Sequence, residues 1–184
     1  PAEPLVIDSG RVSGKLLSSG VKAYFGIPFA APPVRELRWR APQAVTPWKG
    51  VYNADRMPAK CIQYLRNSDL NHYFVEEPTS EDCLYVNVWA PSSAKPGQKL
   101  PALVFIYGGG FVQGSSAMAN YGGESLAKKG VVYVSFNYRV GALGYLDFSR
   151  YSTRRRPIDS NLGLRDQIAA LRWVQANIAA FGGD

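Results

Sequence analysis

Two short, continuous apolar runs in the middle of the chain constrain its fold more than any other feature. Residues 103–107 read Leu-Val-Phe-Ile-Tyr, and residues 131–136 read Val-Val-Tyr-Val-Ser-Phe. Runs of this kind are typical of strands buried on both faces, as in a parallel sheet. Residues 124–129 lie between them and are expected to form a short crossover helix. The order of strand, crossover, strand and helix predicts an α/β fold with a right-handed parallel core.

The helix that follows the second run is expected over residues 161–180. Apolar residues recur there at helical spacing and predict one inward face: Leu164, Ile168, Leu171, Val174 and Ile178. A polar side chain at positions 159–161 (Asp, Ser, Asn) can cap the start, and Gly182 and Gly183 can end the helix. A β-α unit normally leads into another parallel strand. We therefore expect residues 1–184 to be the N-terminal portion of a single domain, with the remainder beyond Asp184, in a precursor or in a separate partner chain.

The first part of the chain reads as short β segments. Residues 5–17 alternate apolar runs with Gly and Ser, as β-hairpins do, and residues 21–27 and 84–89 are further strand candidates, the last with Asn87 inside it. Residues 28–60 contain six prolines and no helical pattern, which indicates an irregular wrapped segment. A small antiparallel β region is expected to precede the main, mostly parallel sheet.

Composition and charge exclude several classes of protein. Hydrophobic residues make up 46% and charged residues 19%, as in a globular domain. The net charge of +7 could suit a nucleic-acid partner, but the basic residues are scattered. The Arg run at 154–156 reads as solvated surface, and no nucleic-acid-binding signature accompanies it. No apolar stretch approaches the roughly 20 residues that span a bilayer, so no transmembrane segment is expected.

The two cysteines and the N-terminus give information on the cellular compartment of the protein. Cys61 and Cys83 are 22 residues apart, which is not a redox CxxC spacing, and two cysteines alone cannot form a tetrahedral zinc site. They are either a disulfide, worth about 3 kcal/mol, or two unrelated buried thiols. A disulfide would favour an extracellular or periplasmic protein. The chain begins at Pro1 without a charged and then apolar leader, which favours a mature N-terminus with any signal peptide removed.

Three consecutive glycines, Gly108, Gly109 and Gly110, directly follow the first buried run and lie between Tyr107 and Phe111. Glycines leave backbone N–H groups uncovered and permit positive φ. Such a loop can direct two N–H donors at a developing negative oxygen, as in an oxyanion hole, and a plain flexible turn is the alternative. A dinucleotide site is disfavoured because the next segment has no apolar helical face, and a P-loop is excluded because Gly-Lys-Ser/Thr is absent.

Several motifs in order along nearly the whole chain resemble the type-B carboxylesterase and cholinesterase family, an α/β-hydrolase family. The motifs are Tyr24-Phe-Gly-Ile-Pro-Phe-Ala30, Leu37-Arg-Trp39, Ser80-Glu-Asp-Cys-Leu-Tyr-Val-Asn-Val88, Tyr107-Gly-Gly-Gly-Phe111, Asn137-Tyr-Arg139, Asn161-x-Gly-Leu-x-Asp-Gln167, Leu171-x-Trp-Val174 and Phe181-Gly-Gly-Asp184.

The resemblance implies roles for named residues and no cofactor or metal. Gly109 and Gly110 would supply oxyanion-hole N–H groups, and Tyr107, Gly108 and Phe111 would contact the substrate. Two structural ion pairs are implied, Arg38 with Glu81 and Arg139 with Asp166. The resemblance also implies a disulfide between Cys61 and Cys83, around a loop near the mouth of the gorge.

The catalytic triad is expected outside this chain, because the family's Gly-x-Ser-x-Gly elbow follows the Phe-Gly-Gly-Asp segment and its acid and histidine come later. Ser125, in Gly-Glu-Ser-Leu-Ala, is expected in the first turn of the crossover helix rather than in an elbow. His72 precedes every candidate serine, against the family order, and is expected to be a loop residue. The segment between the cysteines contains no Trp, although Tyr64, Tyr73 and Phe74 could form an aromatic wall. Its lack of Trp favours general carboxylic esters over choline esters.

The resemblance thus implies a serine esterase or lipase that hydrolyses carboxylic esters. The disulfide, if formed, predicts a secreted or extracellular location, the periplasm included. The alternative is a non-catalytic cholinesterase-like adhesion or binding protein that keeps the fold. An intact glycine loop favours the enzyme, since a binding module has no need of convergent N–H donors.

Overall fold

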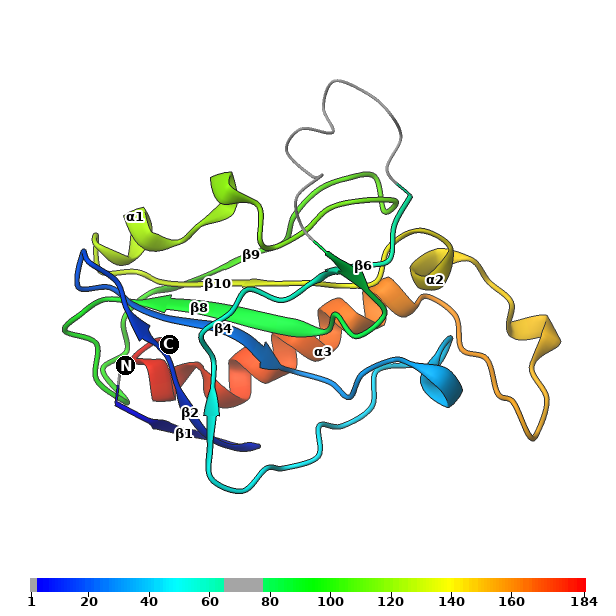
Figure 1. The fold of residues 1–184 in the computed structure, drawn as a ribbon, viewed down its shortest axis with the longest axis horizontal. Helices are drawn as coiled ribbons and strands as arrows, with labels where there is room; N and C mark the ends of the chain where they lie inside the picture. The colour runs from blue at the N-terminus through cyan, green and yellow to red at the C-terminus, as the bar shows by residue number, and fades with distance from the viewer. Residues whose placement is uncertain (1–2, 65–77) are drawn as a thin grey trace.

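A computed structural model of the chain describes residues 3–64 and 78–184 (Figure 1). The strands, in order, are β1 Leu5–Ile7, β2 Gly10–Ser13, β3 Lys15–Leu16, β4 Lys22–Pro28, β5 Val51–Asn53, β6 Lys60–Cys61, β7 Thr79–Ser80, β8 Tyr85–Ala90, β9 Ala102–Phe105 and β10 Val132–Phe136. The helices are α1 Glu124–Ala127, α2 Gly141–Tyr145 and α3 Leu162–Asn177. Short 3₁₀ turns are η1 Arg35–Leu37, η3 Ala119–Tyr121, η4 Ser149–Tyr151 and η5 Ile178–Phe181.

The main sheet has five strands in the order β3-β4-β8-β10-β9. β9 and β10 pair in parallel, with Val134 opposite Val104, whereas the pairs β3·β4, β4·β8 and β8·β10 are antiparallel. The parallel part of the expected sheet is therefore represented here by one pair of strands. The smaller sheet has the order β1-β2-β5, in which β1 and β2 form the expected antiparallel hairpin and β5 adds in parallel to β2.

Alternating side chains of the central strands cover the two faces of the main sheet. Val86, Val88 and Val134 join the cluster that contains Trp173 of α3, whereas Trp89 and Tyr133 pack with Ala127 of α1 on the other face. Figure 1 shows α3 along one side of the strands and α1 on the opposite side. All five residues of β10 are buried, as expected for a central strand covered on both faces.

β9 differs from the expectation of burial on both faces. Leu103 is 41% exposed and Ile106 is 40% exposed, because β9 is the edge of the sheet and no described segment covers that side. The apolar run indicated the strand correctly, but its position at the edge of the sheet leaves it partly exposed among the described residues.

α3 forms where the 161–180 pattern predicts it, yet its inward face is different. Leu164, Ile168 and Leu171 are 50%, 43% and 44% exposed, and only Val174 and Ile178 of the expected face are buried. The buried face consists of Leu162, Gly163, Asp166, Ala170, Trp173, Val174 and Asn177. Small residues on this face allow close approach, and apolar spacing alone cannot distinguish a surface covered here from one that stays open.

The start of α3 has no side-chain cap, contrary to the expectation for positions 159–161. Asn161 adopts a left-handed φ of 53°, and Asp159 instead accepts hydrogen bonds from the backbone of Ala41 (2.7 Å) and the side chain of Arg40 (3.0 Å). At the other end, Gly182 ends η5 with a left-handed φ of 89°, as expected for a C-terminal glycine.

A buried amide supports an irregularity in β4. The pairing register between β4 and β8 shifts between Tyr24 and Ile27, and Gly26 there has a φ of 70°. The Gly26 N–H, released from the ladder, donates to Asn87 Oδ1 at 2.9 Å. Asn87 Nδ2 donates to the hydroxyls of Ser116 (3.1 Å) and Ser135 (3.4 Å). The oxygen and the nitrogen of this buried amide therefore both have hydrogen-bond partners.

Arg139 and Asp166 join α3 to the end of β10. The Asp166 carboxylate accepts from the backbone N–H, Nε and Nη2 of Arg139 at 3.0, 2.8 and 2.8 Å, and both side chains are buried. Burial raises the pKa of the Asp166 carboxyl, and the hydrogen bonds from Arg139 oppose that shift.

We expect Asp166→Ala to lower the free energy of unfolding of the full-length protein by about 3–5 kcal/mol, because it leaves the Arg139 guanidinium buried without its partner. Urea unfolding measures this loss. Glu124→Ala is the control: it removes an exposed pair with Lys128 on α1 and should cost less than about 0.5 kcal/mol. Similar losses in the two variants would contradict a special role for the buried pair.

We expect Gly163→Ala to lower the free energy of unfolding by about 2 kcal/mol through overpacking. A Cβ there would lie 2.4 Å from Arg139 O and 2.5 Å from the Tyr145 ring, a clash that outweighs the helix propensity of Ala, worth about 1 kcal/mol. Gly122→Ala is the matched control, since its Cβ would meet only Ala119 O at 3.6 Å. A stable Gly163→Ala variant would show that α3 can move away from Arg139 and the Tyr145 ring.

Candidate functional site

Residues 107–114, here called the glycine loop, leave the end of β9 in a conformation that requires glycine. Gly109, Gly110 and Gly114 have φ values of 139°, 61° and 135°. A Cβ on Gly109 would lie 1.9 Å from Gln113 O, so no other residue fits there without rearrangement. The positive φ values and the close contact at Gly109 give these glycines a conformational role in the loop.

The turn is closed through a carbonyl, which leaves N–H groups available. Gly109 O accepts from the N–H groups of Val112 (3.2 Å) and Gln113 (3.3 Å). Within residues 3–64 and 78–184, the N–H groups of Gly109 and Gly110 donate to no acceptor. Gly110 is exposed and Gly109 is partly exposed. Two neighbouring donors without partners at the end of a strand are suited to an anionic oxygen.

A pair of tyrosines fixes the first residue of the glycine loop. The rings of Tyr107 and Tyr138 stack with centroids 4.5 Å apart. Tyr138 Oη donates to Tyr107 O at 2.7 Å, while Tyr107 Oη donates to Tyr138 O (3.1 Å) and accepts from the Tyr138 N–H (3.2 Å). Burial raises the pKa of Tyr107 and raises that of Tyr138 to about 12, so both phenols stay neutral at physiological pH. The ring of Tyr107 lies in the core.

Phe111 lies at the surface of the glycine loop. Its side chain is 60% exposed, and its ring centroid lies 4.9 Å from that of Tyr145. Phe111 O accepts from the Gly141 N–H at 2.7 Å, which attaches the middle of the loop to the start of α2. Gly108 is exposed beside it. The loop thus presents an apolar ring and uncovered backbone on the same surface.

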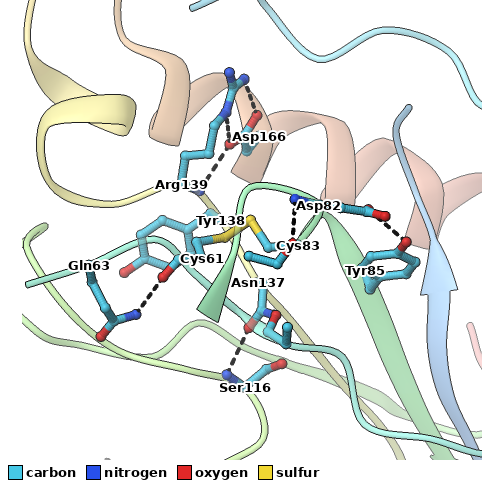
Figure 2. The surroundings of a disulfide bond; sticks show 12 residues. Cys61, Gln63, Asp82, Cys83, Tyr85, Ser116, Asn137, Tyr138, Arg139 and Asp166 are labelled. Carbon is cyan, nitrogen blue, oxygen red and sulfur yellow. Dashed lines mark hydrogen bonds and ion pairs between the residues drawn. A yellow bond between two sulfur atoms is a disulfide. The ribbon is translucent and has the colours of Figure 1, made fainter. Parts of the chain in front are cut away.

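The disulfide between Cys61 and Cys83 is present and both residues are buried (Figure 2). Their Cα atoms are 5.1 Å apart. Of the expected aromatic wall, Tyr64 is 86% exposed, whereas Tyr73, Phe74 and the loop residue His72 lie outside the described residues.

Arg38 and Glu81 form the other implied ion pair, close to the disulfide. The Arg38 guanidinium binds the carboxylate with both Nε and Nη2, the latter at 2.7 Å. Hydrogen bonding to Arg38 lowers the pKa of Glu81. The pair lines the same small cavity as both cysteines and Arg139. It therefore lies at the base of the segment that the disulfide closes.

Other candidates stay apart from the glycine loop. Ser125 is exposed in α1, as expected, and does not follow a buried strand. Among the described residues there is no group of three His, Cys, Asp or Glu side chains suited to a metal ion, and no helix long and apolar enough to cross a membrane. Sequence reasoning assigned no role to Tyr138 or Gly141, whose contacts with the loop arise from segments about 30 residues away.

Comparisons with known proteins identify the relatives of this fold. A profile of the carboxylesterase family matches residues 2–184. The chain is 45% identical to a fumonisin B1 esterase of Sphingopyxis macrogoltabida over 96% of this chain and 32% of that protein, and 42% identical to a cocaine esterase of Oryctolagus cuniculus over 96% and 34%. A Dictyostelium discoideum protein named crystal protein is 39% identical over 98% of this chain and 31% of its own length.

A solved structure of a PNB esterase superposes with a TM-score of 0.89 at 40% identity and covers 100% of this chain and 37% of the esterase. This similarity confirms the expected α/β-hydrolase fold. The chain spans about a third of the length of the curated relatives it matches. On the profile match and these identities, the chain belongs to the carboxylesterase family.

Proposed function

We propose that the full-length protein is a serine esterase that hydrolyses carboxylic esters, and that this chain supplies the oxyanion hole and the N-terminal scaffold. The single observation that carries the proposal is the glycine loop, in which the Gly109 and Gly110 N–H groups have no acceptor among the described residues. The esterase names of the relatives support the same reaction.

In this reaction a serine oxygen adds to the ester carbonyl carbon while a histidine takes the serine proton. The carbonyl oxygen becomes negative, and the N–H groups of Gly109 and Gly110 donate to it. The alcohol then leaves with the proton from histidine, and water hydrolyses the acyl-enzyme in the same way. The serine, the acid and the histidine lie in the part of the protein that follows Asp184.

The exposed residues of the loop point to the substrate class. Phe111 and Val112 are 60% and 58% exposed beside the glycines. Together with Gly108 they would border the bound ester, and their apolar surface suits an uncharged acyl or alcohol group. Tyr107 would act only through its backbone, because its ring packs on Tyr138.

The edge of the main sheet supports our inference that the remainder of the same domain packs here. Gly183 forms a parallel bridge with Leu100, and the N–H of Asp184 donates to Leu100 O at 2.9 Å. A strand continuing in this direction would run beside β9 and cover Leu103 and Ile106. A helix following that strand would cover the exposed face of α3. Whether the remainder is the same chain or a separate one does not alter this contact.

The disulfide supports a secreted or extracellular location. Disulfides persist in oxidising compartments and are rare in the cytosol. Cys61 and Cys83 are both bonded, and the bond closes a segment beside the glycine loop. We infer that the protein folds in an oxidising compartment, the periplasm included.

Labelling with a fluorophosphonate, which reacts with activated serines, tests the function directly. We expect the full-length protein to carry one label on a serine that follows Asp184 in a Gly-x-Ser-x-Gly elbow. Mass spectrometry of the digested protein locates the label. If the folded full-length protein remains unlabelled and does not hydrolyse p-nitrophenyl esters, the non-catalytic adhesion or binding protein becomes the better assignment.

We expect Gly110→Ala to lower kcat for ester hydrolysis by about 100-fold with little change in KM, because a side chain at a φ of 61° moves the N–H that meets the oxyanion. Gly50→Ala is the matched control, since Gly50 also has a positive φ (78°) and open space for a Cβ. Both substitutions should cost about 1 kcal/mol of stability, but only the first should affect kcat. Equal kcat values in the two variants would argue against the oxyanion role.

A further inference from the structure

The segment that leaves the glycine loop is held by a side chain from the disulfide-bonded segment. Gln63 Nε2 donates to Gly114 O at 2.8 Å, and Gln63 Oε1 accepts from the Gly114 N–H at 2.9 Å. The same Nε2 donates to Cys61 O at 3.0 Å (Figure 2). The amide therefore satisfies both backbone groups of Gly114, as a neighbouring strand would.

Gly114 in turn lies directly against the first part of the loop. A Cβ on Gly114 would be 2.4 Å from the Tyr107 ring and 2.8 Å from Gly108 O. The two ends of the glycine loop are thus in contact, and the backbone of Gly109 and Gly110 spans them. A shift of Gly114 would change the conformation of that span, including the direction of its free N–H groups.

Gln63 is attached to the main sheet through the neighbouring disulfide. Cys61 is buried and bonded to Cys83, whose carbonyl accepts from the N–H of Tyr85 at the start of β8. Gln63 is two residues from Cys61, and its own hydrogen bond to Cys61 O restricts its side chain further. The position of Gly114 is therefore set by a chain of contacts that runs from the main sheet through the disulfide and Gln63.

We propose that Gln63 is a positioning residue for the oxyanion hole, which sets the direction of the Gly109 and Gly110 N–H groups by holding Gly114 against the disulfide segment. This inference rests on the proposed ester hydrolysis. Gln63 does not touch the reacting atoms: it acts through the backbone of the loop. Misplacement of catalytic donors by about 1 Å can cost about 100-fold in rate, so a hydrogen-bonded support of this kind matters to kcat.

Gln63→Glu in the full-length protein isolates the donor function of the amide. The substitution keeps the length of the side chain and the acceptor for the Gly114 N–H, but a carboxylate cannot donate to the carbonyls of Gly114 and Cys61. Gln43→Glu is the matched control, because Gln43 Nε2 also donates to a carbonyl two residues before it, Ala41 O at 2.7 Å, on an exposed segment. Both variants carry the same change in charge.

With p-nitrophenyl butyrate as substrate, we expect Gln63→Glu to lower kcat about 10- to 100-fold at pH 8 with KM within twofold, while Gln43→Glu matches the wild type. The ratio of variant to wild-type kcat should rise as the pH falls towards 5, because the protonated carboxyl can donate to one of the two carbonyls. The two facing carbonyls favour the protonated carboxyl, whereas the Gly114 N–H favours the carboxylate.

Hydrogen exchange gives a readout that does not depend on activity. Peptides covering 107–114 should exchange faster in Gln63→Glu than in the wild type, with no change in peptides from β8 or α3. If the wild type is active and Gln63→Glu has the same kcat and the same hydrogen exchange as the wild type, this proposal is overturned. The proposed function is then unaffected. If the wild type is inactive, the proposed function is overturned. In that case, equal hydrogen exchange at 107–114 in Gln63→Glu and the wild type would still show that Gln63 does not hold the loop.

Discussion

The five residues that follow β10, 137–141, connect the long helix to the glycine loop, and the arrangement of the site depends on them. Arg139 pairs with Asp166 of α3 in a buried, bidentate contact. On either side of it, Tyr138 stacks on Tyr107, and the Gly141 N–H donates to Phe111 O. A displacement of α3 would therefore move two attachment points of the loop. The site is set by contacts between segments far apart in sequence rather than by the loop alone.

The cost of burying polar groups accounts for the hydrogen bonds around the buried ion pair. Burying the charges of Arg139 and Asp166 is expensive, and hydrogen bonds to both carboxylate oxygens compensate for much of that cost. The same holds for Asn87, whose amide binds Gly26 and Ser135 of the sheet and Ser116 outside it. The N–H groups of Gly109 and Gly110 differ from these buried groups, because they donate to no acceptor among residues 3–64 and 78–184. They lie at the surface, where water can satisfy them until an anionic oxygen takes its place.

The sequence predicted the elements well where local chemistry decides them. Apolar runs located β9 and β10, and the glycine at 182 ended the last helical turn as expected. It failed at the cap of α3, because Asp159 binds the backbone of Ala41, over a hundred residues away in sequence. It also failed for the face of α3, because helical spacing of Leu, Ile and Val does not show which side meets the sheet. Such partners are chosen by the packing of distant segments.

The sequence by itself determined the α/β topology, the family and the position of the glycine loop, because these depend on residue type and order. The cysteine pairing was implied only by the resemblance, since two cysteines alone left free thiols open. Tertiary structure alone decided that Tyr107 faces the core, that Tyr138 and Gly141 hold the loop, and that Gln63 closes it at Gly114. The physical reason is that hydrogen-bond partners are selected by distance in space, which the order of residues does not record.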